Sequence, residues 1–127
     1  MSVLIDGSAG VTTNAGGSVN PSTNVEGINY SCRAWVNFNG TGTVAIRASG
    51  NVTDITDGGT GIYTVNFTTS MPDANYAENV SCNYRTGSGV GTIAQILTQT
   101  TSNTQVFSIE EAGGAIDTDV YCVAVFR

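Results

Sequence analysis

The residue types that acid–base or nucleophilic catalysis needs are scarce in this chain of 127 residues. There is no histidine, so a Ser-His-Asp triad would lack its base. Near the three cysteines, only Arg33 and Arg85 could favour a reactive thiolate. Carboxylate pairs of the kind that glycosidases use remain, namely Asp73 with Glu78 or Glu110 with Asp117. Because the chain has ten carboxylates, such pairs arise by chance, and we predict that the protein is not an enzyme.

Acidic side chains beside glycines are the candidates for metal binding. Asp54 and Asp57, with the carbonyls of Gly58 and Gly59, offer the oxygen ligands of a calcium loop. A second acidic group, around a glycine turn, consists of Glu110, Glu111, Asp117 and Asp119. Aspartate beside glycine is also typical of solvated turns, and without histidine or paired cysteines a transition metal is disfavoured. We therefore expect no metal and no cofactor, and Asp54 and Asp57 are the weak candidates.

One aromatic side chain on a polar strand face is the main candidate for binding. Trp35 alternates with Ser31, Arg33 and Asn37, and this face is polar enough to be exposed. Tryptophan and arginine are enriched at binding hot spots, so Trp35 with Arg33 could anchor a subunit contact or a glycan ring. The alternative is that Trp35 fills a secondary core.

The last strand-like stretch, 119–127, is apolar on both of its faces. Two apolar faces indicate either a central position in a sheet or a contact with another subunit. One face of this stretch is therefore a second candidate interface, in addition to the polar face that carries Trp35. The interface candidates are Arg33, Trp35, Tyr121, Val123 and Val125.

The elements that must position these residues are strands. Threonine, serine, asparagine and glycine supply most of the polarity, and they favour pleated strands and tight turns. Alternating stretches occur at 30–38, 43–48, 52–56, 62–69, 76–85, 92–100, 104–110 and 119–127. Their spacing of about ten residues, with glycine-rich turns between them, is typical of an antiparallel β-sandwich of jelly-roll or immunoglobulin-like type. We predict an extended arm over 1–28, with one short strand from Ser2 to Ile5, and a β-sandwich domain over 29–127.

The charge balance disfavours nucleic acid and membranes as partners. The net charge is −6, and the four cationic residues, all arginines, are widely separated. A phosphate-binding surface or an anionic membrane needs clustered cations. There is no apolar run long enough to span a bilayer, and the N-terminus does not read as a signal peptide. We expect no nucleic-acid binding and no membrane insertion.

The cysteines do not resemble a secreted disulfide framework, because their number is odd and no CxxC spacing occurs. Cys32, Cys82 and Cys122 each lie in a strand-like stretch with apolar residues two positions away. We interpret them as buried reduced thiols that act as small hydrophobic residues. A disulfide between two of them remains open, and folding in a reducing cytosol fits best.

A family resemblance extends over part of the chain. Residues 33–57 read RAWVNFNGTGTVAIRASGNVTDITD, and after a glycine-rich turn the chain continues with GIYTVNF at 61–67 and MPDANY at 71–76. This string resembles a domain of tail-fibre-like and other structural proteins of tailed phages and prophages, where it commonly stands at the outward C-terminal end. Residues 4–11, LIDGSAGV, are similar to leader segments of such proteins. The resemblance implies a β-sandwich, a homotrimer and a place on the virion surface after assembly in the host cytoplasm, without catalytic residues.

Two functions of different kinds follow from the resemblance. In the first, the domain is a tail-fibre-like or tail-tip adhesion module that binds a host receptor, with avidity from repeated copies. In the second, it is a capsid decoration protein that clasps coat subunits with residues 1–28; the absence of a fibrous shaft before the domain favours this alternative. A carbohydrate-binding domain unrelated to phage ranks third. The expected partners are copies of the chain in a trimer, coat or tail subunits, and a host surface glycan.

Overall fold

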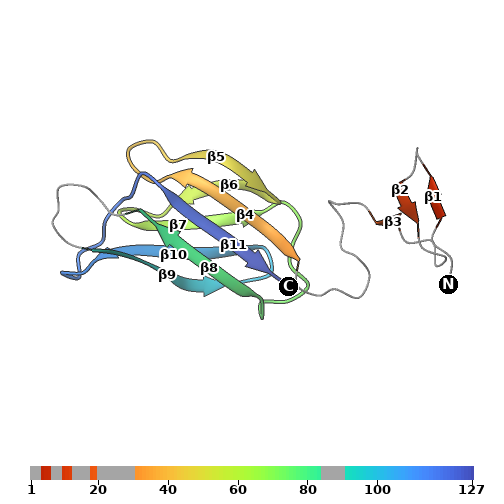
Figure 1. Ribbon diagram of the computed structural model, residues 1–127. Coiled ribbons are helices and arrows are strands. Elements are labelled where there is room, and N and C mark those ends of the chain that lie inside the picture. The colour runs from red at the N-terminus through yellow and green to blue at the C-terminus, as the bar shows by residue number, and fades with distance from the viewer. Residues whose placement is uncertain (1–3, 7–9, 13–17, 20–30, 84–90) are drawn as a thin grey trace. The chain divides into compact units, whose positions relative to one another are not determined.

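The computed structural model of the chain describes residues 4–6, 10–12, 18–19, 31–83 and 91–127. All secondary-structure elements within these ranges are β-strands. No helix that could cross a membrane occurs in this part of the chain. The chain divides into two compact units, Met1–Ser31 and Cys32–Arg127 (Figure 1).

The first unit contains a small antiparallel sheet where the sequence pattern predicts an extended arm. Its strands are β1 (Leu4–Asp6), β2 (Gly10–Thr12) and β3 (Ser18–Val19), and they pair in that order. Strands of two or three residues are too short to show apolar alternation, which is why the pattern does not reveal them. The predicted strand from Ser2 to Ile5 overlaps β1 at Leu4 and Ile5, and its first half lies outside the described residues.

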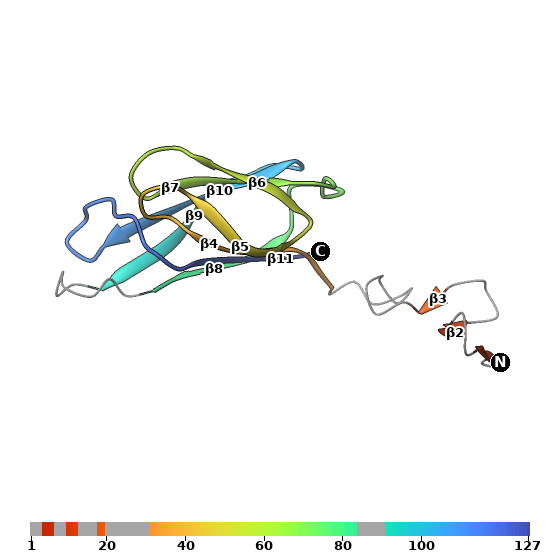
Figure 2. The same ribbon diagram turned by 90° about the horizontal axis from the view of Figure 1, so that it is seen from above.

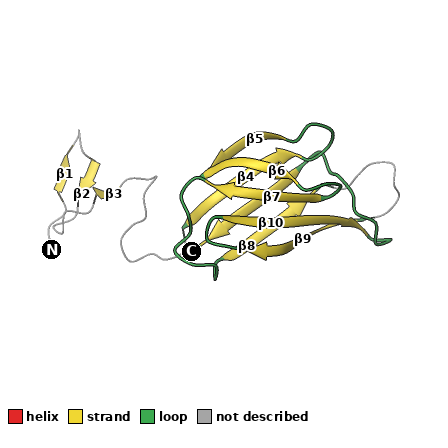
Figure 3. Cartoon of the chain, turned by 180° about the vertical axis from the view of Figure 1, so that it is seen from behind, coloured by secondary structure: helices red, strands yellow, loops and turns green. Residues whose placement is uncertain are grey.

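The second unit is an antiparallel β-sandwich, which confirms the predicted fold class. Sheet I has the strand order β5-β4-β11-β8, and sheet II has the order β6-β7-β10-β9. Sheet I consists of β4 (Cys32–Asn39), β5 (Ala45–Gly50), β8 (Ala77–Cys82) and β11 (Tyr121–Phe126). Sheet II consists of β6 (Val52–Asp57), β7 (Ile62–Phe67), β9 (Thr92–Gln99) and β10 (Asn103–Glu110). Figure 2 shows the two sheets as stacked layers, and Figure 3 gives the view from the side of sheet II.

The connections bring the two ends of the sandwich domain together in sheet I. The hairpins β4–β5, β6–β7 and β9–β10 each remain within one sheet, whereas the chain changes sheet after β5, β7, β8 and β10. The last strand, β11, pairs with the first strand of the domain, β4, on one side and with β8 on the other. This arrangement confirms the central position that two apolar faces indicate for β11.

The core lies between the sheets and is filled by every second residue of the central strands. From β4, β7 and β11 it takes the buried side chains of Ala34, Val36, Phe38, Tyr63, Val65, Phe67, Tyr121, Val123 and Val125. Three of these rings meet at its centre: Phe38 lies 5.1 Å from both Tyr63 and Tyr121, measured between ring centroids. Because side chains alternate along a strand, the neighbouring residues of β4 and β11 must point to the outer face of sheet I.

Candidate functional site

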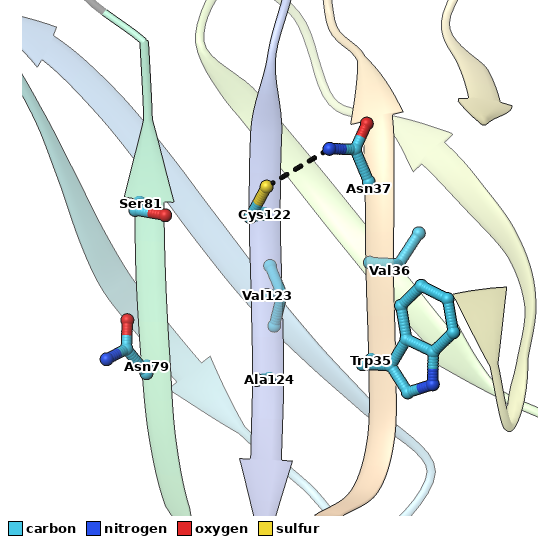
Figure 4. A pocket seen from close by; sticks show the side chains of 8 residues that line it. All are labelled: Trp35, Val36, Asn37, Asn79, Ser81, Cys122, Val123 and Ala124. Atoms are coloured by element: carbon cyan, nitrogen blue, oxygen red, sulfur yellow. Dashed lines mark hydrogen bonds between the residues drawn. The ribbon is translucent and has the colours of Figure 1, made fainter. Parts of the chain in front are cut away.

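The outer face of sheet I contains an open hollow of about 320 Å³, which we call the Trp35 hollow (Figure 4). Its volume lies at the lower end of the range of about 300–1,000 Å³ that is typical of small-molecule sites. Strands β4, β8 and β11 contribute its lining. The lining residues are Trp35, Val36, Asn37, Asn79, Ser81, Cys122, Val123 and Ala124.

The register of three strands aligns the outward side chains of the hollow in two rows. In one row, Ala124 is paired with Trp35 on one side and with Asn79 on the other. The second row has Cys122 between Asn37 and Ser81 in the same way. Directly paired residues of antiparallel strands point to the same face, so each row forms a continuous strip across the sheet. The middle of both strips is formed by small side chains, and this is what leaves the face hollow there.

The indole ring of Trp35 borders this hollow and is 44% exposed. Figure 4 shows the ring extending from β4 to the side away from β11. Gly50, its partner on β5, permits this position: a Cβ atom at Gly50 would lie 2.5 Å from the indole Nε1 and 3.0 Å from Cδ1. Since real Cβ atoms do not approach so closely, any larger residue at Gly50 would displace the ring. The glycine therefore lets the indole lie over β5 and keeps the space over Ala124 open.

The polar groups around the hollow are only partly used within the protein. The Nδ2 atom of Asn37 donates to the Cys122 sulfur at 3.2 Å, and its Oδ1 accepts from Arg47 at 3.4 Å. Within the described part of the chain, the indole N–H and the side chains of Asn79 and Ser81 make no hydrogen bond. Asn79 and Ser81 are exposed. The hollow thus presents an aromatic ring and unengaged donors and acceptors to the solvent.

Among the described residues, no charged side chain lines the hollow, although Glu78 is the neighbour of Asn79 in β8. Glu78 points to the opposite face, where its Oε2 accepts from Thr104 at 2.8 Å and from Gln99 at 3.1 Å. Its Oε1 is buried without a hydrogen-bond partner in the described residues. Burial raises the pKa of this carboxyl, while the bonds from Thr104 and Gln99 act in the other direction. The alternation of β8 therefore separates a buried carboxyl from an uncharged outer face.

The five predicted interface residues lie in different environments in the structure. Trp35 is exposed on the outer face of sheet I, as its polar strand face predicts. Arg33 is partly buried and does not line the hollow. The pairing of β11 with β4 shifts register at this point and leaves Arg33 without a partner residue on β11.

The prediction that Tyr121, Val123 and Val125 form a subunit contact is wrong for this fold. They are 0%, 3% and 0% exposed and belong to the core between the sheets. Their side chains are the bulkier set of β11, and the bulkier set fills the core. The outer face of β11 instead carries Cys122, Ala124 and Phe126.

The weak metal candidates both have partners within the protein. Asp54 Oδ1 accepts from Asn66 Nδ2 at 2.6 Å, and Asp57 Oδ1 accepts from the backbone N–H of Gly59 at 2.9 Å. Both lie on β6, at exposed positions. Across residues 4–6, 10–12, 18–19, 31–83 and 91–127, no three or more histidine, cysteine or acidic residues form a group that could hold a metal ion.

The carboxylates considered for acid–base chemistry have structural partners. Asp73 forms an ion pair with Arg127, and its pKa is lowered by the backbone N–H of Asn75 and by this arginine. Asp117 Oδ1 accepts from the Gly61 N–H at 2.7 Å and from the Tyr63 hydroxyl at 2.8 Å. Asp117 thereby joins the turn before β7 to the segment that leads into β11.

The three cysteines are free, and they occupy different environments. Cys82 is packed against the core, and burial raises the pKa of its thiol. Cys122 is half-buried and borders the hollow. Cys32 is exposed, so the prediction of a buried thiol is wrong there; it begins β4, where Ala34 is the first fully buried residue.

Sequence reasoning missed Gly50 under the indole ring and, in the lining, Asn79, Ser81 and Ala124. Alternation in 76–85 does place Asn79 and Ser81 on a polar face. Their position beside Trp35 depends on β8 and β4 pairing with the same central strand, and a strand order of this kind leaves no local signal. Comparisons with known protein families, curated proteins and solved structures found no match for the chain.

Proposed function

We propose that the protein is a non-catalytic adhesion module on the surface of a tailed-phage particle and that the Trp35 hollow contacts the host receptor. The observation that carries the proposal is the exposed indole of Trp35 beside the unengaged side chains of Asn79 and Ser81. Tryptophan is enriched at binding hot spots because it brings a large apolar surface and an N–H donor at a small cost in conformational entropy. The resemblance of residues 33–76 to tail-fibre-like proteins supports the place on the virion.

The fold suits repeated, weak attachment. The lining side chains stand on β4, β8 and β11, where hydrogen-bonded pairing on either side of β11 positions them before a ligand arrives. A preorganised surface avoids part of the ordering cost of binding. In a homotrimer, as the resemblance implies, three such surfaces would bind together, and the avidity would exceed the affinity of one.

The test combines location on the virion with adhesion to host cells. Gold-labelled antibodies on purified particles should mark the tail end, and label over the head would favour the capsid decoration function instead. Purified protein should bind cells of the bacterial host, and Trp35→Ala should weaken this binding by about 2 kcal/mol or more, roughly 30-fold.

The matched control is Ile93→Ala on β9. Ile93 is 47% exposed, close to the value for Trp35, but it lies in sheet II. We expect this variant to bind cells like the wild type, with gel filtration confirming that both variants keep the wild-type assembly state. Equal losses from the two variants, or no loss from Trp35→Ala, would contradict a receptor contact at the hollow.

A further inference from the structure

We infer that the ligand of the Trp35 hollow is an uncharged pyranose ring of a surface glycan. This inference rests on the proposed adhesion function and names the chemical class that the hollow can recognise. Three properties of the hollow point to it: the aromatic ring at its border, the kind of polar groups in its lining, and the absence of charged side chains among the described residues of that lining.

The aromatic ring matches one face of a sugar. The C–H bonds on the less polar face of a pyranose carry a small positive charge, and the face of an indole ring carries the negative end of its quadrupole. Trp35 is held over Gly50 on one side and borders the hollow on the other. A sugar ring that enters the hollow can therefore pack against an indole that is already in position.

The polar lining matches the hydroxyl groups of a sugar. A hydroxyl both donates and accepts, and so do amide and hydroxyl side chains. Asn79 and Ser81 are unengaged within the described residues and line the hollow beside the floor formed by β11. The Trp35 N–H, which is also unengaged there, lies on the β5 side of the ring, next to Gly50. The Asn37 amide is oriented by its bond to Cys122 and by the donor Arg47, which fixes one further polar group at the edge.

Charge separates neutral sugars from the other ligands of a tryptophan. In the part of the chain that the structure describes, no cation lines the hollow to bind an acidic sugar, and the chain carries a net charge of −6, which repels anionic glycans. A quaternary ammonium ligand is usually bound in a cage of aromatic rings, whereas the described residues bring one ring and no carboxylate to the lining of the hollow. A neutral pyranose needs neither a cation nor an aromatic cage, so it is compatible with this lining.

The wild-type protein carries its own reporters for a direct test. Trp35 is the only tryptophan of the chain, so its fluorescence reports on the hollow alone. Titration with galactose, glucose, mannose and N-acetylglucosamine should change the emission in a saturable way for at least one of them. N-acetylneuraminic acid and choline chloride should cause no saturable change, and stronger binding of either would overturn the inference.

Cysteine alkylation gives a second, independent readout. A bound sugar should protect Cys122 in the hollow from iodoacetamide, while exposed Cys32 outside it continues to react. Mass spectrometry of the peptides measures both sites in one sample. Equal protection of both cysteines, or of neither at a saturating sugar concentration, would contradict binding in the hollow.

Gly50→Ala tests the geometry without removing the tryptophan. The added methyl group displaces the indole, so we expect the sugar affinity to fall about tenfold or more while the fluorescence reporter stays in place. Wild-type affinity in a folded Gly50→Ala protein would overturn the role of the indole as a platform.

The outcomes also separate this inference from the adhesion function. If Trp35→Ala abolishes cell binding but no neutral sugar binds or competes with cells, the sugar inference is wrong and adhesion stands. If a neutral sugar binds in the hollow but Trp35→Ala leaves cell binding unchanged, the sugar site stands and the adhesion function is wrong.

Discussion

The two faces of sheet I use the same strands in opposite ways. On the inner face, β4 and β11 present Val36 and Tyr121, which are buried to 2% and 0% exposure and fill the core. On the outer face, the neighbouring residues Trp35 and Ala124 leave a hollow with one exposed ring at its border. Because side chains alternate along a strand, one set of strands can hold the fold together and present a binding surface at the same time.

The comparison teaches that packing, rather than apolar character, distinguishes the two faces. Both faces carry aromatic and small apolar residues, but only the inner face buries them fully, in the central strands β4 and β11. Stability should therefore depend on the inner residues, and binding on the outer ones. Substitutions on the two faces of one strand can test this division directly.

The largest expected effect is that of Tyr121→Ala on the inner face. Tyr121 packs against Phe38 and Tyr63, and its hydroxyl donates to the Phe107 carbonyl at 3.0 Å. Removal of a buried aromatic ring leaves a cavity, and we expect the free energy of unfolding to fall by about 3–5 kcal/mol. Urea denaturation followed by circular dichroism measures this loss.

The control is Cys122→Ala, at the next residue of β11, which points to the outer face; we expect it to change the free energy of unfolding by less than about 1 kcal/mol. Equal losses would remove the distinction between the faces.

A smaller effect is expected where the tight inner packing continues into a turn. Gly61 has a φ angle of 72°, and a Cβ atom there would lie 2.5 Å from the Ser108 carbonyl oxygen. Gly61→Ala combines a strained backbone with this contact, so we expect a loss of about 1–3 kcal/mol in the free energy of unfolding. Gly114→Ala, where no atom lies within 4 Å of the added Cβ, is the control. If both variants are as stable as the wild type, the packing at this turn is looser than the distances indicate.

On β8 the contrast lies between inward Glu78 and outward Asn79. Burial raises the pKa of Glu78, so the folded protein binds a proton more tightly there than the unfolded chain does. The contribution of Glu78 to stability is therefore complete below its unfolded pKa and is lost as the pH rises through its folded pKa. We expect Glu78→Gln to be more stable than the wild type at pH 7, and the difference should shrink toward pH 4.

Melting temperatures of both proteins across this pH range measure the effect. The same substitution at exposed Glu111 is the control for a general change in net charge. A difference between Glu78→Gln and the wild type that is constant with pH, or that grows in acid, would mean that the buried carboxyl does not titrate as its surroundings require.

Alternation predicts which residues of β4 point inward, because its polar and apolar residues occupy different faces. Ala34, Val36 and Phe38 are buried and Trp35 is exposed, as the pattern indicates. In β11 both faces are apolar, so alternation alone cannot tell which one is inside, and here the interface prediction failed.

The neighbours of Trp35 across the sheet lie beyond sequence reasoning for a different reason. Asn79 is 44 positions away in the chain, by subtraction of the residue numbers, and Ala124 lies between them in the sheet. Only the strand order brings them together, and it results from the packing of the whole domain. The candidate residue was thus predictable from the sequence, but the hollow around it was not.

The smallest expected effect on stability is that of Trp35→Ala. The ring is 44% exposed in the folded protein and loses only part of its contact with water on folding, so its removal should cost about 1–2 kcal/mol, less than that of a fully buried ring. Denaturation of this variant beside Tyr121→Ala compares two aromatic residues on opposite faces of one sheet. A loss of about 3 kcal/mol or more for Trp35→Ala would place the indole among the residues that hold the fold. A small loss together with weaker cell binding means that the ring acts on a ligand, because a variant that is still folded and keeps the wild-type assembly state can lose adhesion only through the missing contact.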